Sequence, residues 1–407
     1  MNILFVGGTW NEDYCEKGGY GVIYKKTYQN PIDIYKLRYT YGKSSHLVDS
    51  VVEEIVGNMS DEDSLACFNG GRYSDLEDIL KTTSEYDYVF WWANVSNDLP
   101  KIRNVKDIAP YVMFINSKRD DEDRYSFQEL IQRSLVAKAN LTWKFKKIVN
   151  KIFEITIFDP LGSVWFKGTD IKEAVNACLN RIMFLKSMTR QPSIKTNKID
   201  IIPDEQNFVD VVRKYATEFQ KYMDSSVKTE RFIGNASLRF IKPFRDSRCG
   251  KGMPSFRGSD NMIFVSKRNI DKQFIELDNF VPVYMNDDRL MYCGNDKPSV
   301  DTPVQIRLYK AFPQINYMLH SHCYIKNAPF TRTAIPCGAI EEADEVINAL
   351  ASYKIDNKIP QMFAINLIGH GSIVMWNNME QFHKEIEPTL EYYKRDMPEI
   401  CINERIR

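Results

Sequence analysis

The 407-residue sequence has little of several features that would place it in a specialised class of protein. Lys and Arg together number 54, as do Asp and Glu, so there is no net charge to attract a nucleic-acid backbone over the whole surface. No apolar run approaches the roughly 18 residues of a membrane span. Internal repeats and low-complexity tracts are missing as well. We therefore expect no membrane partner, and the scattered Lys/Arg pairs give little support to nucleic-acid binding.

Cysteine-rich and leader-like segments are also missing. The eight cysteines are scattered along a long chain, without paired C-x-x-C spacing or the density of a small secreted scaffold. The segment from Met1 to Gly8 has too few apolar residues and no leading basic cluster for a secretory signal. We expect reduced thiols and a cytoplasmic location.

What the chain does contain is enough apolar material for two domains. Its 43% hydrophobic and 27% charged residues lie within the range of globular proteins. Its length exceeds the usual size of one domain. The stretch 191–206 has two prolines and little periodicity. This pattern predicts a linker between a first domain of residues 1–190 and a second of residues 207–407.

In residues 1–190, apolar runs alternate with segments of helical periodicity. The apolar runs are 2–6, 86–95, 111–116 and 153–158, and the helical segments are 126–138 and 170–186. This alternation predicts an α/β domain with a largely parallel, doubly wound sheet, Rossmann-like or flavodoxin-like.

Polar clusters follow several of these expected strands. They lie at 69–72, 94–98, 117–120 and 159–162, and Gly7-Gly8-Thr9 follows the first strand. If these loops share the carboxyl edge of a parallel sheet, they form a small-molecule site. We expect a nucleotide or nucleoside-like ligand there. The alternative is a set of ordinary solvated turns, since no G-x-G-x-x-G dinucleotide motif is found.

The candidate chemistry lies in residues 207–407. The whole chain has five histidines, and two of them form His320-Ser321-His322 after an apolar segment. On a strand, residues i and i+2 point to the same face, so both imidazoles can reach one metal ion. A third histidine, His370, lies between Gly369 and Gly371, which permit close approach at a crowded site. Three neutral imidazoles that leave coordination positions open are typical of a catalytic zinc site.

An acidic residue stands upstream of the histidine pair. Asp301 follows Pro298, Ser299 and Val300 and precedes a segment of helical pattern at 304–311. A helix and a turn can return its carboxylate to the metal, where it either ligates or moves a proton. The alternative is that Ser299 or Asp301 caps the helix.

Residues 204–384 carry several short motifs in a characteristic order. These are 234–239 (G-N-A-S-L-R), 264–271, 298–301, His320-Ser321-His322 and Gly369-His370-Gly371. The ordered set resembles the class II aldolase/adducin superfamily of zinc-dependent sugar-phosphate aldolases and epimerases. Because Asp301 stands where fuculose-phosphate aldolases carry glutamate, the chain looks more like the L-ribulose-5-phosphate 4-epimerases.

The resemblance implies an α/β/α fold for the second domain and a homo-oligomer, typically a tetramer. It implies Zn²⁺, or another divalent cation, bound by His320, His322 and His370, with Asp301 as the catalytic residue. It also implies a site for the phosphate of a sugar phosphate, formed by Asn235, Ser237, Lys267, Arg268 and Ser299.

The expected function is that of a zinc-dependent sugar-phosphate lyase, which breaks a C–C bond by retro-aldol cleavage through a metal-stabilised enediolate. Readdition of the aldehyde to its other face gives an L-ribulose-5-phosphate 4-epimerase-like isomerase instead, and expulsion of hydroxide gives a dehydratase. A non-catalytic adducin-like interaction module is a further alternative, against which the three histidines argue.

The first domain resembles no family that we recognise, and we expect it to supply substrate choice or a second activity, which would make the protein bifunctional.

Proton transfer needs one more acid or base. Tyr309 is one candidate, and Tyr392 or Tyr393 from a neighbouring subunit are others, although core packing is the simpler interpretation of all three. Glu341-Glu342 is interpreted as the acidic first turn of a helix.

Overall fold

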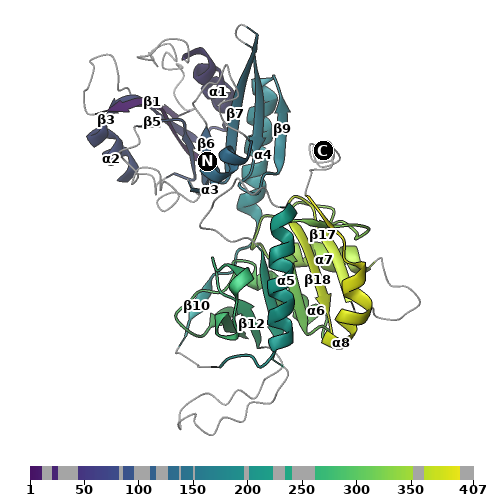
Figure 1. The fold of residues 1–407 in the computed structure, drawn as a ribbon. Coiled ribbons are helices and arrows are strands. Elements are labelled where there is room, and N and C mark those ends of the chain that lie inside the picture. The colour runs from purple at the N-terminus through teal and green to yellow at the C-terminus, as the bar shows by residue number, and fades with distance from the viewer. Residues whose placement is uncertain are drawn as a thin grey trace. The chain divides into compact units, whose positions relative to one another are not determined.

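The computed structural model describes residues 1–11, 21–25, 45–81, 86–95, 111–115, 127–136, 139–149, 152–196, 201–222, 234–240, 262–351 and 362–394. The chain divides into two compact units (Figure 1). The first unit reaches from Met1 to Lys186, and the second begins at Ser187.

Strands and helices alternate along the first unit. Its elements are β1 (Asn2–Asn11), β2 (Gly21–Lys25), α1 (Ser45–Gly57), β3 (Ser64–Arg72), α2 (Tyr73–Lys81), β4 (Tyr88–Trp91), β5 (Asn94–Val95), β6 (Tyr111–Ile115), α3 (Phe127–Val136), β7 (Leu141–Val149), β8 (Ile152–Phe158), β9 (Val164–Gly168) and α4 (Ile171–Ser187). The strand order is β2-β3-β1-β4-β6-β7-β8-β9, with β5 beside β1. Strands β3, β1, β4, β6 and β7 are parallel, whereas β2, β8 and β9 are antiparallel to their neighbours.

Both faces of this sheet are covered by helices, because the strands are apolar on both sides. Along β1, Ile3 and Phe5 pack into one cluster with residues of α1 and α4. Leu4 and Val6, which point the other way, pack into a second cluster with residues of α2. A parallel strand buried on both faces is expected to be continuously apolar, and the sequence of β1 follows that rule.

The expected strands and helices of this unit are found within a few residues of their predicted ends. The runs at 2–6, 86–95, 111–116 and 153–158 correspond to β1, β4 with β5, β6 and β8, and the helical segments correspond to α3 and α4. The sheet is largely parallel, as predicted. The antiparallel extension through β7, β8 and β9 was not foreseen, since alternating apolar runs do not distinguish a hairpin from a crossover.

Two of the polar clusters differ from the expectation of loops at the carboxyl edge of the sheet: 69–72 in not being a loop, and 159–162 in lying at the other edge. Residues 69–72 are the end of β3 itself, paired with β1, and do not form a loop after a strand. Residues 159–162 form the turn between β8 and β9, where Asp159 accepts hydrogen bonds from the backbone N–H groups of Leu161 and Ser163. Because β8 runs antiparallel to β7, this turn lies at the amino edge of the parallel strands. The cluster at 117–120 and residues 96–98 lie outside the described residues.

The second unit is built on one long sheet. Its elements are β10 (Ser193–Lys195), α5 (Gln206–Tyr222), β11 (Asn235–Arg239), β12 (Ile263–Ser266), η7 (Lys272–Phe274), η8 (Leu277–Asn279), β13 (Phe280–Asn286), β14 (Arg289–Tyr292), α6 (Thr302–Ala311), β15 (Tyr317–Ser321), β16 (Tyr324–Ile325), α7 (Glu341–Ala351), β17 (Met362–Leu367), β18 (Gly371–Trp376), α8 (Met379–Gln381), η9 (Phe382–Ile386), η10 (Glu387–Thr389) and β19 (Tyr392–Tyr393). The strand order is β10-β14-β13-β12-β11-β15-β18-β17, with β16 and β19 forming a separate pair.

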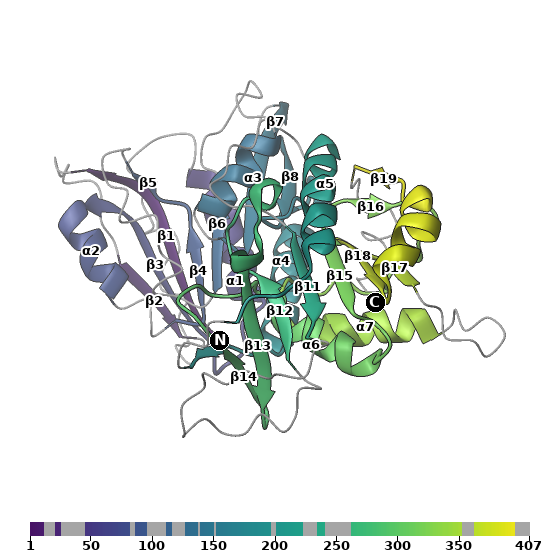
Figure 2. The same cartoon turned by 60° about the horizontal axis from the view of Figure 1, so that its bottom comes forward.

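Helices flank this sheet on two sides and give an α/β/α arrangement. One face packs against α5 and η9, with Phe208 at the centre of rings from Phe280, Tyr317 and Trp376. The other face packs against α6 and α7, which lie side by side (Figure 2). Strand β15 lies inside the sheet between β11 and β18, so residues at its carboxyl end meet side chains from both neighbours.

The segment 191–206, expected to be a linker, contributes to the second unit. Its residues 193–195 form β10, which pairs in parallel with β14. Among the described residues, no helix has the length and apolar character needed to cross a membrane.

Candidate metal centre

The three predicted histidines lie together at the ends of two neighbouring strands. His320 is in β15, His322 follows that strand, and His370 is in the turn between β17 and β18. Their ring centroids are 4.6–5.0 Å apart, and one nitrogen of each ring lies within 4.8 Å of the others. His320 and His370 are buried and His322 is partly exposed. The fold therefore brings three imidazole nitrogens to one point, and one of the three side chains is partly exposed.

Close backbone approach makes this convergence possible. A Cβ atom on Gly371 would lie 1.9 Å from the carbonyl oxygen of Ser321, so β18 and the end of β15 can approach only with glycine at this position. On the other side, Gly234 has φ +83°, and a Cβ atom there would lie 2.7 Å from the carbonyl oxygen of His320. The expectation that a glycine beside His370 permits close approach is confirmed at Gly371.

Hydrogen bonds orient two of the rings. His320 Nδ1 is 2.9 Å from the carbonyl oxygen of Ser372, and His370 Nδ1 is 2.6 Å from Glu342 Oε1. A carbonyl oxygen and an ionised carboxylate only accept, so both Nδ1 atoms donate and each Nε2 carries the lone pair. Burial lowers the pKa of His320 to about 4, helped by the neighbouring His370, so this imidazole is neutral at neutral pH.

The environment of His320 fits a cation. Its Nε2 atom is buried and has no hydrogen-bond partner among the described residues. A buried nitrogen lone pair that faces two further imidazoles is costly unless a donor or a cation occupies the space between them. Imidazoles whose other nitrogen bonds a carbonyl or carboxylate are typical of metal ligands. The three histidines therefore fit a divalent metal ion.

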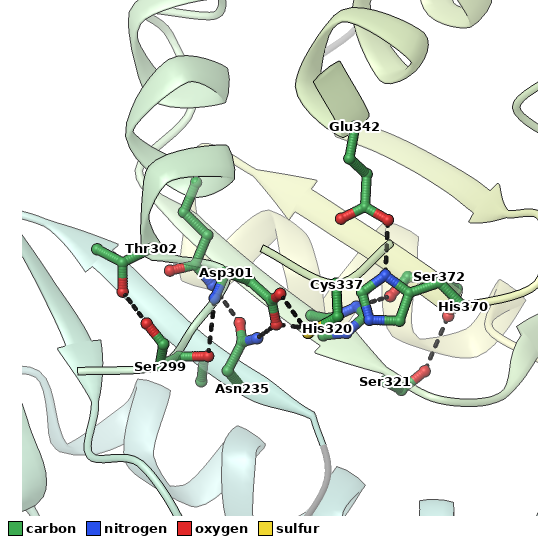
Figure 3. A network of polar contacts seen from close by, with 12 residues as sticks. Asn235, Ser299, Asp301, Thr302, His320, Ser321, Cys337, Glu342, His370 and Ser372 are labelled. Atoms are coloured by element: carbon green, nitrogen blue, oxygen red, sulfur yellow. Dashed lines mark hydrogen bonds and ion pairs between the residues drawn. The ribbon is translucent and has the colours of Figure 1, made fainter. Parts of the chain in front are cut away.

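Asp301 lies beside the histidines, as predicted. It precedes α6 as the N-cap residue, but its side chain makes no capping hydrogen bond. Its Oδ2 accepts a hydrogen bond of 2.8 Å from Asn235 Nδ2 and lies 3.9 Å from His320 Nε2 (Figure 3). Its Oδ1 accepts a hydrogen bond of 2.9 Å from Cys337 Sγ. The carboxylate is thus free of the helix and directed at the histidine cluster.

The charge of Asp301 is stabilised despite its burial. Burial raises the pKa of Asp301, but the neighbouring His370 and His320 and the hydrogen bond from Cys337 outweigh it, so the pKa lies below its ordinary value. Burial raises the pKa of Glu342 above its ordinary value, and the contact with His370 opposes part of that increase.

Residues 218–381 match the family described as the class II aldolase and adducin N-terminal domain. The C-terminal half contains a class II aldolase/adducin domain. No curated protein matches the chain. Similar solved structures include an L-fuculose 1-phosphate aldolase, with 13% identity over 46% of this chain and 82% of the other at a TM-score of 0.30. An aldolase II superfamily protein from Pseudomonas syringae has 13% identity over 46% and 73%, with a TM-score of 0.29. The DNA/pantothenate metabolism flavoprotein from Streptococcus pneumoniae has 11% identity over 46% and 99%, with a TM-score of 0.32.

In the aldolase/adducin domain, two of the segments predicted to bind phosphate lie side by side. The backbone N–H of Arg268 donates to the carbonyl oxygen of Lys297, and Lys267 pairs with Pro298 in an isolated β-bridge. Asn269 has φ +58°, a left-handed conformation that glycine adopts most easily. Lys267 Nζ forms an ion pair of 3.0 Å with Asp296. Two cationic side chains and the turn before Asp301 therefore belong to one loop cluster.

The other predicted phosphate residues are engaged by the protein itself. Asn235 pairs with His320 across the sheet, and its side chain holds Asp301 and contacts Gln305. Ser299 Oγ accepts a hydrogen bond of 3.3 Å from the backbone N–H of Asp301. Both residues therefore position Asp301 through these hydrogen bonds.

Ser237 and Tyr309 face each other in the core of the aldolase/adducin domain. Both residues are buried, and the two hydroxyl oxygens are 3.1 Å apart. Tyr309 also donates to the carbonyl oxygen of Ser237, at 2.9 Å. Burial raises the pKa of Tyr309 above its ordinary value. The structure does not bring either hydroxyl to the histidines, so their roles in phosphate binding and acid–base chemistry find no support in these contacts.

Replacing Tyr309 by phenylalanine is expected to leave zinc affinity unchanged and to lower the free energy of unfolding by about 1 kcal/mol, the usual contribution of a buried hydrogen bond. Competition with a chromophoric chelator and denaturant unfolding measure the two effects. A large fall in zinc affinity with an unchanged free energy of unfolding would show that the Tyr309 hydroxyl acts on the histidine cluster.

The two C-terminal tyrosines differ in exposure. Tyr392 is buried against the rings of Tyr215 and Phe219, which agrees with the packing interpretation. Tyr393 is exposed, and its ring packs against that of Tyr324. Their expected action in a neighbouring subunit stays a prediction.

Sequence reasoning missed two residues that contact this site. The sequence indicates only an acidic helix start at Glu342, yet this residue is 3% exposed and its carboxylate bonds His370, a candidate metal ligand. The sequence presents Cys337 as one of eight scattered thiols, yet it bonds Asp301. The sequence offers only a weak indication of these two residues, which is an acidic pair at the start of a helix that follows Pro336 and Gly338.

Proposed function

We propose that the C-terminal half is a divalent-metal-dependent enzyme, most simply a zinc-dependent sugar-phosphate lyase. The observation that carries the proposal is the meeting of three imidazoles beside a buried, ionised Asp301. His320, His322 and His370 would hold the ion. When bound, a divalent ion polarises a carbonyl oxygen and stabilises the negative charge that develops there during C–C cleavage.

The protein's own groups supply proton transfer and orientation. Retro-aldol cleavage removes a proton from the hydroxyl on one side of the breaking bond and delivers a proton to carbon on the other side. Asp301 is held by Asn235 and Cys337, so its carboxylate is fixed for such a transfer. Lys267 and Arg268 offer positive charge to a substrate phosphate. This arrangement serves an L-ribulose-5-phosphate 4-epimerase-like isomerase equally well, because the two reactions share their first step.

The first unit is proposed to be a doubly wound domain. The parallel order β3-β1-β4-β6-β7, with helices on both faces, supports this assignment, because the chain moves outward from β1 in one direction and then in the other. Ligands of such sheets bind at the carboxyl edge where the order reverses, here beside β1 and β4. A nucleotide-like ligand there and a homo-oligomeric assembly stay predictions.

Elemental analysis followed by product analysis tests the proposed reaction. We expect about one divalent ion per chain, as for a catalytic zinc site, and loss of that ion in a His320→Ala/His322→Ala variant. A panel of ketose phosphates should then yield aldehyde from a lyase, or a stereoisomer without aldehyde from an epimerase. Chelation should abolish either product, and zinc should restore it. A wild-type protein that takes up no metal even after incubation with zinc would contradict the enzyme proposal and favour an adducin-like interaction module.

A further inference from the structure

A thiol lies at the edge of the histidine cluster, on the side of Asp301. Cys337 Sγ is 2.9 Å from Asp301 Oδ1. Sγ, a carboxylate oxygen of Asp301 and a ring nitrogen of His370 all lie within 4.8 Å of one another. His370 therefore belongs to two overlapping groups of possible ligands, the three imidazoles and the Asp301-Cys337-His370 set. Figure 3 shows the second set.

The backbone around Cys337 holds the thiol in this place. Gly338 has φ +78°, and a Cβ atom there would lie 2.8 Å from the carbonyl oxygen of Val300, so this loop packs directly on the turn that carries Asp301. Ala339 forms an isolated β-bridge with Arg190, and Glu341 accepts a hydrogen bond from the backbone N–H of Thr189. These contacts fix the loop on both sides and keep Sγ within 4.8 Å of a carboxylate oxygen of Asp301 and a ring nitrogen of His370.

We propose that Cys337 is a direct ligand of the metal ion in the substrate-free protein, completing a site of histidine nitrogens and one thiolate. This inference rests on the metal site of the proposed function and specifies its donor set. As the metal–sulfur bond forms, the S–H bond breaks, and the proton passes to Asp301 Oδ1, its present acceptor, and then to solvent. A thiolate favours zinc and cobalt over magnesium and manganese, which prefer oxygen ligands.

Cobalt(II) loaded into the protein alone, without substrate, is the probe. Thiolate coordination gives an intense near-ultraviolet charge-transfer band, which a site of nitrogen and oxygen ligands lacks. We expect this band in the wild type and its loss in Cys337→Ser, whose hydroxyl preserves the hydrogen bond to Asp301. The weaker visible bands of cobalt should persist in that variant, because the three histidines remain. Cys323→Ala is the matched control, since this buried thiol follows His322 but bonds Ser321 and lies outside both ligand groups.

The outcomes separate this inference from the proposed function. A wild type that binds cobalt without the charge-transfer band, or a band that survives in Cys337→Ser, would overturn the thiolate ligand and leave the histidine site standing. A wild type that binds no cobalt would overturn both proposals. Because Cys337→Ser could also disturb folding, the wild type provides a second measurement. Carbamidomethylation of Cys337 by iodoacetamide, mapped by mass spectrometry, should be slowed by zinc, and an unchanged rate in the zinc-bound protein would contradict ligation.

Discussion

Replacing Gly371 by alanine is expected to destroy the metal site. The new Cβ would lie 1.9 Å from the carbonyl oxygen of Ser321 and 2.8 Å from the Cα of His322. Both are backbone atoms, so the clash cannot be relieved by rotating a side chain, and β18 must move away from β15. In a site whose groups must converge, a displacement of roughly 1 Å lowers metal affinity by about 100-fold. Overpacking also lowers the free energy of unfolding by about 1–3 kcal/mol.

Two measurements check this result. Zinc affinity should fall by about 100-fold or more, measured by competition with a chromophoric chelator, and the melting temperature should fall as well. Gly57→Ala is the matched control, because no atom lies within 4 Å of a Cβ at that position, at the end of α1. That control should match the wild type in both measurements. Wild-type zinc affinity in Gly371→Ala would show that the close approach of β15 and β18 is not what assembles the histidines.

The histidine cluster could be predicted because its geometry is local. Two histidines separated by one residue on a strand share a face whatever the rest of the fold does. The third required only that β18, the strand after His370, pair beside β15, and the flanking glycines pointed to a tight approach. Asp301 was predicted on a different ground, because a helix and a turn between it and His320 can return its carboxylate to the metal.

The contacts around that cluster could not be predicted, because they depend on how separate elements pack. Glu342 reaches His370 only because α7 lies over this end of the sheet, next to α6. Ser237 shares a face of β11 with Asn235 but lies about 7 Å further along the strand, which places its hydroxyl against Tyr309. Strand periodicity predicts the face of a residue and not its neighbour across an interface.

The first unit illustrates the same limit at the scale of a sheet. Its apolar runs predicted the parallel centre correctly, including β1, whose residues are buried on both faces. The runs did not predict that β8 would return beside β7 as a hairpin, which moves the turn at Asp159 to the opposite sheet edge. Strand direction is set by the length and course of each connection, and the periodicity of apolar residues does not predict either of them.

Replacing Glu342 by glutamine is expected to weaken metal binding by about 10-fold, the lower end of the range for residues that orient a metal-ligating histidine. The carboxylate accepts a 2.6 Å hydrogen bond from His370 Nδ1 and is almost fully buried. Glutamine has the same size and still accepts that hydrogen bond, but it lacks the negative charge that makes the ring more basic. Glu342→Ala also leaves His370 Nδ1 without its acceptor, so this variant should bind metal about 100-fold more weakly than the wild type.

Glu341→Gln provides the control, because this neighbour in the same helical turn bonds the backbone N–H of Thr189 and makes no described contact with a histidine. Zinc affinities of the three variants should therefore fall in the order Glu341→Gln, Glu342→Gln, Glu342→Ala, with the first equal to wild type. Equal affinities throughout would mean that His370 is oriented by its own backbone turn, with Gly369 and Gly371 on either side, and that the buried carboxylate serves packing alone. A graded loss with unchanged melting temperatures would instead assign Glu342 to the metal site through its charge, since a purely structural carboxylate would alter stability before it altered affinity.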